Sequence, residues 1–188
     1  MFYGEKVRLR AFEMSDLDVI MAHWNNWELR RTLLLHLPVS REYEKKWLEN
    51  VVMSTPETGD VYFAITDKLN GELIGSVGLH KIEKHHRAEL GIAIYKTQMQ
   101  NKGYGTDAMI TCLWVAFHIL NLHSVFLRVF SYNKRGIRVY EKVGFKHAGK
   151  FRDVIFIEGQ YHDEYLMDIL QAEFFEKYPP GTFIGKKP

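Results

Sequence analysis

The longest apolar stretch of the chain, residues 108–122, places the strongest constraint on its fold. We expect it to form most of a helix over residues 105–120 that is apolar on nearly all sides and therefore packs against a sheet. Thr111, His118 and Asn121 interrupt the stretch, and it is shorter than the roughly 20 residues that span a bilayer. Because 46% of the 188 residues are hydrophobic, the chain can build a core, and global disorder is excluded.

The segments around this helix predict a mixed sheet. Short apolar or alternating runs predict strands at residues 6–10, 61–66, 72–79, 88–95, 124–130, 154–157 and 161–168, with a further extended segment from residue 145. The Asn70-Gly71 pair predicts one tight hairpin, and Glu158-Gly159-Gln160 predicts another. Helices are expected at residues 16–26, 41–53 and 133–143. This order of elements indicates an α+β fold.

The chain shows no internal boundary. It has no linker, charge block or repeat, so we expect a single domain over residues 1–188 with its core at about 6–172. The end of the chain, residues 174–188, contains Pro179-Pro180-Gly181 and is expected to be a surface tail.

Charge and cysteine content restrict the partners and the compartment. The net charge of +2 argues against a protein that coats nucleic acid. The single cysteine, Cys112, cannot form an internal disulfide, and residues 1–6 lack the apolar core of a signal peptide. We therefore expect a cytoplasmic protein with neither a nucleic-acid nor a membrane partner.

A glycine-rich turn, residues 100–106, lies between a predicted strand and the long apolar helix. Gly103 and Gly105 allow a ligand to approach the backbone closely, and the first amides of the helix carry the positive end of its dipole. Together with Lys102 these features predict a phosphate site. The turn is neither a Walker loop nor a dinucleotide fingerprint, and a purely structural turn is the alternative.

Asn133 and Tyr140 are the second pair of interest. They are seven residues apart on a predicted helix, two turns, and so project from nearly the same side. A phenol there can protonate a leaving thiolate, and an amide side chain can hold the polar backbone of a ligand. The alternative for Tyr140 is a partly buried core tyrosine.

Taken together, these segments resemble the GNAT superfamily of acetyl-CoA-dependent N-acetyltransferases. The resemblance rests on Gln100-x-x-Gly103-x-Gly105 after one strand and on Asn133 followed by Tyr140-Glu141-Lys142-Val143-Gly144-Phe145 after the next. It extends through Leu9-Arg10-Ala11-Phe12, Asp16-Leu17, residues 70–75, Arg87-Ala88-Glu89-Leu90-Gly91 and residues 158–163. It covers about residues 6–172. The pattern of motifs is similar to that of the RimJ/RimL-type branch and to that of spermidine acetyltransferases.

The resemblance implies a central sheet that is largely antiparallel and an acetyl-CoA cleft between two splayed strands. It implies pantetheine contacts at Ile92, Ala93, Ile94 and Asn133, pyrophosphate contacts from the amides of Gln100, Asn101, Lys102, Gly103, Tyr104, Gly105 and Thr106, and an adenosine-phosphate contact at Lys142. Lys142 as a merely solvated lysine is the alternative.

Two departures from the family pattern affect this loop. Asn101 and Lys102 stand within the usual Gln-Gly-x-Gly start, where one glycine is replaced. The connection at residues 96–99 is one residue longer than usual and lacks the frequent proline, and a bulge would absorb the extra residue.

The implied reaction transfers an acetyl group directly from the thioester to a primary amine in a ternary complex. Glu89 is the candidate general base through a water, with a surface carboxylate paired with Arg87 or a neighbouring lysine as the alternative. A backbone N–H near Ile92 or Ala93 would stabilise the oxyanion, and Tyr140 would protonate the thiolate.

Other reactive residues carry less weight. Cys112 lies in an apolar helix, which argues against an acetyl-cysteine route. His80, His85 and His86 have no recognised metal-ligand spacing, so no metal is expected. The tryptophans at helical spacing, Trp24, Trp27 and Trp47, are read as core residues, with a role in acceptor binding as the alternative.

The acceptor and the oligomeric state stay open at this stage. A polyamine needs several carboxylates, for which the sequence offers Glu28, Glu83, Glu89, Asp153, Glu158 and Glu164. A protein N-terminus needs an open groove and fewer charges. A noncatalytic acyl-CoA-binding module on the same fold is the alternative to an enzyme, and a homo-oligomer is not excluded.

Overall fold

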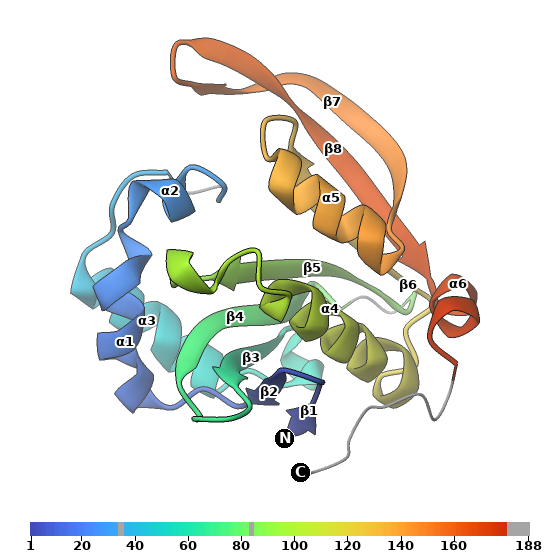
Figure 1. Cartoon of the computed structure of the whole chain (residues 1–188), viewed down its shortest axis with the longest axis horizontal. Helices are drawn as coiled ribbons and strands as arrows, with labels where there is room; N and C mark the ends of the chain where they lie inside the picture. The colour runs from blue at the N-terminus through green and yellow to red at the C-terminus, as the bar shows by residue number, and fades with distance from the viewer. Residues whose placement is uncertain (34–35, 83–84, 180–188) are drawn as a thin grey trace.

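An eight-stranded sheet forms the centre of the structure, a computed structural model that describes residues 1–33, 36–82 and 85–179 (Figure 1). The strands lie in the order β1-β2-β3-β4-β5-β6-β8-β7. Their bounds are Phe2–Tyr3 (β1), Val7–Arg10 (β2), Val61–Asp67 (β3), Leu73–His80 (β4), Arg87–Ile94 (β5), Ser124–Phe130 (β6), Lys146–Ile157 (β7) and Gln160–Leu170 (β8). Neighbouring strands in this order are antiparallel except β5 and β6, which are parallel. The predicted α+β fold with a mixed, largely antiparallel sheet is confirmed.

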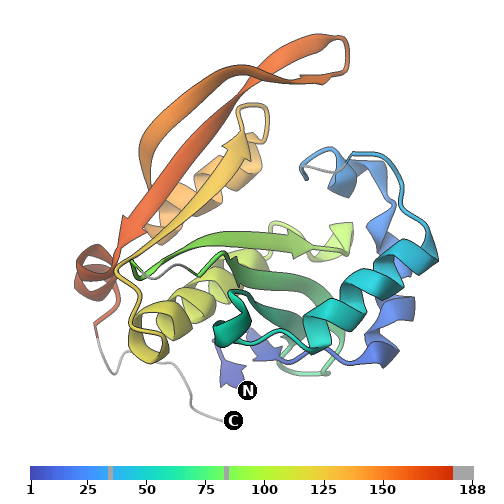
Figure 2. The same cartoon turned by 180° about the vertical axis from the view of Figure 1, so that it is seen from behind.

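Helices cover both faces of the sheet. On one face lie α1 (Leu17–Trp24), α2 (Trp27–Arg30) and α3 (Arg41–Val52), and on the other lies α4 (Tyr104–Trp114), which continues as a π-helical turn over Val115–Ile119 (Figures 1 and 2). The helix α5 (Lys134–Val143) packs beside α4. Because side chains alternate along β5, Leu90 joins the core under α4 and Ala93 joins the core under α1 and α3. The long apolar helix is therefore buried against the sheet as predicted.

The parallel neighbours β5 and β6 separate soon after they meet. Their pairing is confined to Arg87, Ala88 and Glu89 of β5 and residues 124–126 of β6. Beyond this point β5 runs on to Ile94 and β6 to Phe130, and the two strands diverge (Figure 2). The splayed strands implied by the family resemblance are thus present.

The end of the chain differs from the prediction of a surface tail. Residues Gln171–Lys177 form α6, in which Phe174 is fully buried and its ring centroid lies 5.2 Å from that of Phe117. Tyr178 donates a hydrogen bond to the carbonyl of Val143 at 3.2 Å. The expectation that the surface tail begins at residue 174 is therefore wrong for these residues, because their aromatic side chains complete the core beneath α4. Residues 180–188, which include Pro180 and Gly181, lie outside the described residues.

Asp107 fixes the start of α4 to the edge of the sheet. Its buried carboxylate accepts hydrogen bonds from the backbone N–H groups of Glu5, Lys6 and Val7 at 3.0, 2.8 and 2.9 Å. These amides lie at the turn from β1 into β2, and Val7 is the first residue of β2. The first turn of α4 is therefore held in place by the beginning of the chain.

No helix in the described part of the chain is long and apolar enough to cross a membrane.

Replacing Asp107 with alanine tests this anchor. Asp107→Ala leaves three backbone N–H groups without their acceptor, and we expect the free energy of unfolding to fall by about 2–5 kcal/mol in urea titrations. The matched control is Asp18→Ala, which removes an exposed carboxylate paired with Arg41 and should cost less than ~1 kcal/mol. Equal losses in the two variants would contradict the anchor.

Candidate functional site

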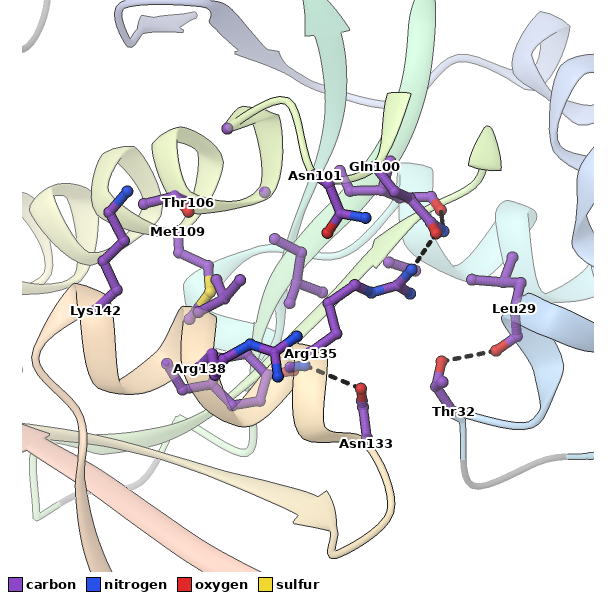
Figure 3. Close-up of a pocket in the computed structure, with 18 residues that line it drawn as sticks. Leu29, Thr32, Gln100, Asn101, Thr106, Met109, Asn133, Arg135, Arg138 and Lys142 are labelled. Atoms are coloured by element: carbon purple, nitrogen blue, oxygen red, sulfur yellow. Dashed lines mark hydrogen bonds between the residues drawn. The ribbon is translucent and has the colours of Figure 1, made fainter. Parts of the chain in front are cut away.

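Two cavities meet in the gap between β5 and β6. The first has a volume of 320 Å³ and lies among β5, the loop before α4, and α5 (Figure 3). The second, of 450 Å³, opens on the other side of the gap, among β3, β4, β5, β6 and β8. Thr32, Ile92, Asn133 and Tyr140 line both cavities. A reaction between two ligands, one in each cavity, would take place at these four residues.

The loop and first turn of α4 form one wall of the first cavity. Gly103 caps the helix with a left-handed backbone (φ +89°), and Asp107 N–H makes the first helical hydrogen bond, to Gly103 O at 3.0 Å. The N–H groups of the residues before Asp107 have no acceptor within the helix, and they carry the positive end of the helix dipole. Gly105 and Thr106 of this first turn line the cavity, so the positive end lies at the cavity. This arrangement suits a phosphate group.

The loop adapts to its departures from the family pattern. Asn101, at the replaced glycine, has φ +58°, a left-handed conformation that asparagine tolerates better than most residues. The longer connection forms a short 3-10 turn, Thr97–Met99, in place of the suggested bulge. The Gln100 amide then donates to the carbonyl of Ile94 at 3.1 Å and so ties the loop back to β5.

The helix α5 forms the opposite wall and is more basic than the sequence analysis recognised. Asn133 caps it by accepting from Gly136 N–H at 3.0 Å, and Lys142 lies toward its other end. Between them Arg135 and Arg138 also line the cavity, and Arg135 donates to the side-chain oxygen of Gln100 (Figure 3). The spacing of Arg138 and Lys142, one helical turn apart, could have revealed this basic face.

Most of the residues expected to contact the cofactor come together in this cavity. These are Ile92, Ala93, Ile94, Gln100, Asn101, Gly103, Gly105, Thr106, Asn133 and Lys142. Two expected residues lie outside its lining. The carbonyl of Lys102 accepts from the Lys6 ammonium at 2.8 Å, and the Tyr104 hydroxyl donates to Asp67 at 2.6 Å, on the side of the loop away from the cavity.

Tyr140 lies where the two cavities join. Its ring is partly buried and packs near Phe145, with 6.3 Å between ring centroids. Burial raises the pKa of the Tyr140 hydroxyl to about 12, although the charge of Arg135 opposes this increase. The hydroxyl is therefore protonated at neutral pH and is available as a proton donor.

Glu89 lines the second cavity but is held in ion pairs. It accepts from Arg128 Nε at 2.8 Å and lies 3.5 Å from the ammonium of Lys81. Burial alone would raise the pKa of Glu89, but the hydrogen bond and charge of Arg128, with a smaller contribution from Lys81, hold it below the ordinary value. A carboxylate stabilised in this way is a weak proton acceptor. The geometry thus favours the ion-pair alternative, with Arg128 as the main partner.

The other carboxylates are spread over the molecule. Glu164 and Asp60 line the second cavity with Glu89, and Asp60 was not among the carboxylates considered from sequence. Glu28 lines a neighbouring hollow that contains Arg31, and Glu158 pairs with Arg31 at 2.8 Å. Asp153 is exposed on β7, and Glu83 lies outside the described residues.

Cys112 and the three tryptophans lie outside both cavities. Cys112 is fully buried, and burial raises the pKa of its thiol to about 12. Trp24 packs on Tyr95, and Trp47 packs on Phe12. Trp27 is exposed but does not line either cavity. Within the described ranges, no three His, Cys, Asp or Glu side chains gather in a group that could hold a metal ion.

Comparisons with known proteins agree with this architecture. Residues 6–146 match the family model described as an acetyltransferase (GNAT) domain. A spermidine N(1)-acetyltransferase of Vibrio cholerae is 29% identical over 185 residues, 93% of this chain and 98% of the relative. A putative ribosomal N-acetyltransferase of Bacillus subtilis is 32% identical over 106 residues, 56% of this chain and 57% of the relative.

A solved structure of the same type superposes over most of the chain. It is a crystal structure of spermidine N-acetyltransferase from Vibrio cholerae in complex with CoA and spermine. The TM-score is 0.81 at 29% sequence identity, and the match covers 90% of this chain and 98% of that chain.

Replacing Arg128 with methionine tests the ion pairing of Glu89. Because burial remains while the strongest hydrogen bond is lost, we expect the pKa of Glu89 to rise above its usual value in Arg128→Met, as followed by carbon NMR of labelled glutamate. Lys81→Met, which removes the more distant partner, should raise it less. A Glu89 pKa that is unchanged in Arg128→Met would contradict this account.

Proposed function

Because this chain belongs to the GNAT acetyltransferase family, we propose that it transfers the acetyl group of acetyl-CoA to a primary amine of an aliphatic polyamine. In this proposal acetyl-CoA occupies the first cavity and the amine occupies the second. The observation that carries it is the meeting of the two cavities at Tyr140, in the gap between β5 and β6.

The residues of the first cavity fit a molecule with phosphates at one end and a thin polar arm. The diphosphate would lie at the start of α4, where Gly105 has no side chain to obstruct it. Arg138 and Lys142 would supply positive charge for the phosphates. The pantetheine arm would follow Ile92–Ile94, whose backbone is not paired with β6, and would contact Asn133. Acetyl-CoA would bring the acetyl group to this point as a reactive thioester.

The second cavity suits a cationic acceptor of moderate charge. It contains the carboxylates Asp60, Glu89 and Glu164 and two cations, Lys81 and Arg128, so its formal charge is negative. The relatives named as spermidine acetyltransferases, which match nearly the full length of this chain, support a polyamine. A protein N-terminus is the other acceptor class, and the relative named as a putative ribosomal N-acetyltransferase favours it over part of the chain.

The chain's residues would complete the transfer at the junction of the cavities. Tyr140 would donate its hydroxyl proton to the departing thiolate. A backbone N–H near Ile92 or Ala93 would stabilise negative charge on the carbonyl oxygen. Tyr140 at this point disfavours a noncatalytic binding module. We also propose a cytoplasmic location, because Cys112 is a free buried thiol in the described structure.

A screen of acceptors tests the polyamine. Purified protein with acetyl-CoA would be offered spermidine, spermine, N-terminal peptides of ribosomal-protein type, and a monoamine, with thiol release as the readout. We expect kcat/KM for spermidine to exceed that for the monoamine by about 10-fold or more, because additional ammonium groups can pair with the carboxylates of the second cavity. Preference for the peptides would replace the polyamine with a protein N-terminus, in line with a RimJ/RimL-type enzyme.

Removal of one hydroxyl tests the proton donor. We expect Tyr140→Phe to lower kcat by about 10²–10⁴-fold, while the Kd for acetyl-CoA measured by calorimetry changes less than about twofold. Tyr3→Phe is the matched control, since the Tyr3 hydroxyl contacts Met1 and lies outside both cavities. Unchanged turnover in Tyr140→Phe would rule out this role.

A further inference from the structure

The proposed acetyl transfer needs a proton acceptor that Glu89 does not supply. An aliphatic amine has an ordinary pKa of about 10.4, so at neutral pH it arrives as ammonium and cannot attack until it loses a proton. Glu89 is already engaged with Arg128 and Lys81. Another basic group lining the second cavity is therefore needed.

His80 occupies a suitable place in that cavity. It is the last residue of β4, and its register partner on β5 is Glu89. Its side chain is partly buried and lines the second cavity together with Gly91, Ile92 and Tyr140. The ring packs edge-on to Tyr62 of β3, with 4.9 Å between ring centroids.

A hydrogen-bonded chain determines which nitrogen of His80 carries the proton. The Tyr62 hydroxyl lies 3.4 Å from Asp60 Oδ2 and 3.2 Å from His80 Nδ1. An ionised carboxylate can only accept, so the single hydroxyl proton of Tyr62 points to Asp60. The Tyr62 oxygen then accepts from His80 Nδ1–H, which leaves Nε2 unprotonated with a free lone pair.

Two glycines leave room for this nitrogen above the backbone of β5. A β-carbon at Gly91 would lie only 2.8 Å from His80 Nε2, and one at Gly78 would lie 3.0 Å from the Tyr62 ring. Both positions lack a side chain, so the His80 ring can lie over the backbone of β5. Its Nε2 therefore lies against Gly91 in the second cavity, next to Ile92, and Ile92 lines both cavities.

His80 is neutral at neutral pH despite the carboxylates around it. Burial lowers the pKa of His80 below 6.5. Asp60 and Glu89 oppose this shift, and Lys81 adds to it. Tyr62 stays protonated, because burial raises the pKa of its hydroxyl to about 12. Arg128 of β6 and Glu164 of β8 also face this cavity and are paired with each other at 3.8 Å.

We propose that His80 Nε2 is the group that takes the proton from the acceptor ammonium, directly or through one water, with Tyr62 and Asp60 positioning its ring. This inference rests on the proposed acetyl transfer in the second cavity. One N–H bond of the ammonium breaks and its proton moves to Nε2, and the freed electron pair forms the N–C bond as the C–S bond breaks. Tyr140 protonates the sulfur and is reprotonated by the second proton from nitrogen. His80 returns the first proton to solvent.

Kinetics of His80→Gln with spermidine test the role in turnover. We expect kcat/KM at pH 7 to fall about 10²–10³-fold, and the Kd for acetyl-CoA to stay within about twofold, because His80 does not line the first cavity. The acid limb of the wild-type profile, with a midpoint below 6.5, should vanish, and the variant's rate should recover toward high pH as the free amine becomes abundant. His147→Gln, at an exposed position on β7, is the matched control and should behave as wild type.

Tyr62→Phe separates positioning from packing. Loss of the hydroxyl disconnects the imidazolium from Asp60, so the acid limb should move to lower pH with a smaller loss of rate, about 5–20-fold. A variant that only loosened packing would lose rate without moving the limb. An His80→Gln enzyme within about threefold of wild type from pH 6 to 9, with the same acid limb, would overturn the proposal.

Nitrogen NMR of the histidine side chains tests the protonation state and tautomer of His80 independently of the acceptor. We expect His80 to be neutral at pH 7 with its proton on Nδ1, and the Nδ1–H signal to shift in Tyr62→Phe. A protonated ring, or a proton on Nε2, would overturn the proposal. If wild-type protein acetylates no spermidine, the polyamine assignment fails, while this measurement still tests His80.

Discussion

The short parallel pairing of β5 with β6 is the constraint on which the rest of this structure depends. The strands share three residue positions and then part, so the sheet behaves as two antiparallel halves joined along a brief seam. Backbone groups that would otherwise complete a ladder are left to bind something else. One cavity lies beside α4 and the other lies on the face that carries α1 and α3, so two ligands would reach the gap from different sides.

Rigid elements hold the residues that border this gap. Asp107 ties the first turn of α4 to the beginning of the chain, and Asn133 and Gly144 define the ends of α5. Phe174 fills the core beneath α4. A site built on helix ends and strands in this way has its geometry set before a ligand arrives, which is what a transfer between two bound molecules requires.

Local signals in the sequence were sufficient to predict most helices and strands and one side of the site. Hairpin turns and the glycine-rich loop depend on neighbours within a few residues, so the turns at Gly71, Gly103 and Gly159 could be placed without a structure. Pairings between distant segments could not. Arg128 is 39 residues from Glu89, and Asp60, Tyr62 and His80 meet only because β3 and β4 pair. The burial of Phe174 could not be predicted locally, because it depends on packing against Phe117, which is distant in the sequence.

The hydrogen bond between Arg135 and Gln100 spans the mouth of the first cavity, from α5 to the loop before α4. The Gln100 amide also donates a hydrogen bond to the carbonyl of Ile94, so polar groups at this mouth already have partners within the protein. A ligand that entered here would exchange one set of hydrogen bonds for another. Its net gain in binding free energy would then be smaller than the number of new contacts suggests. Within the described residues Arg138 has no such bond to give up across the mouth, so its charge would be available to an anionic ligand in full. A ligand that used either Arg135 or the Gln100 oxygen would first have to break the hydrogen bond between them.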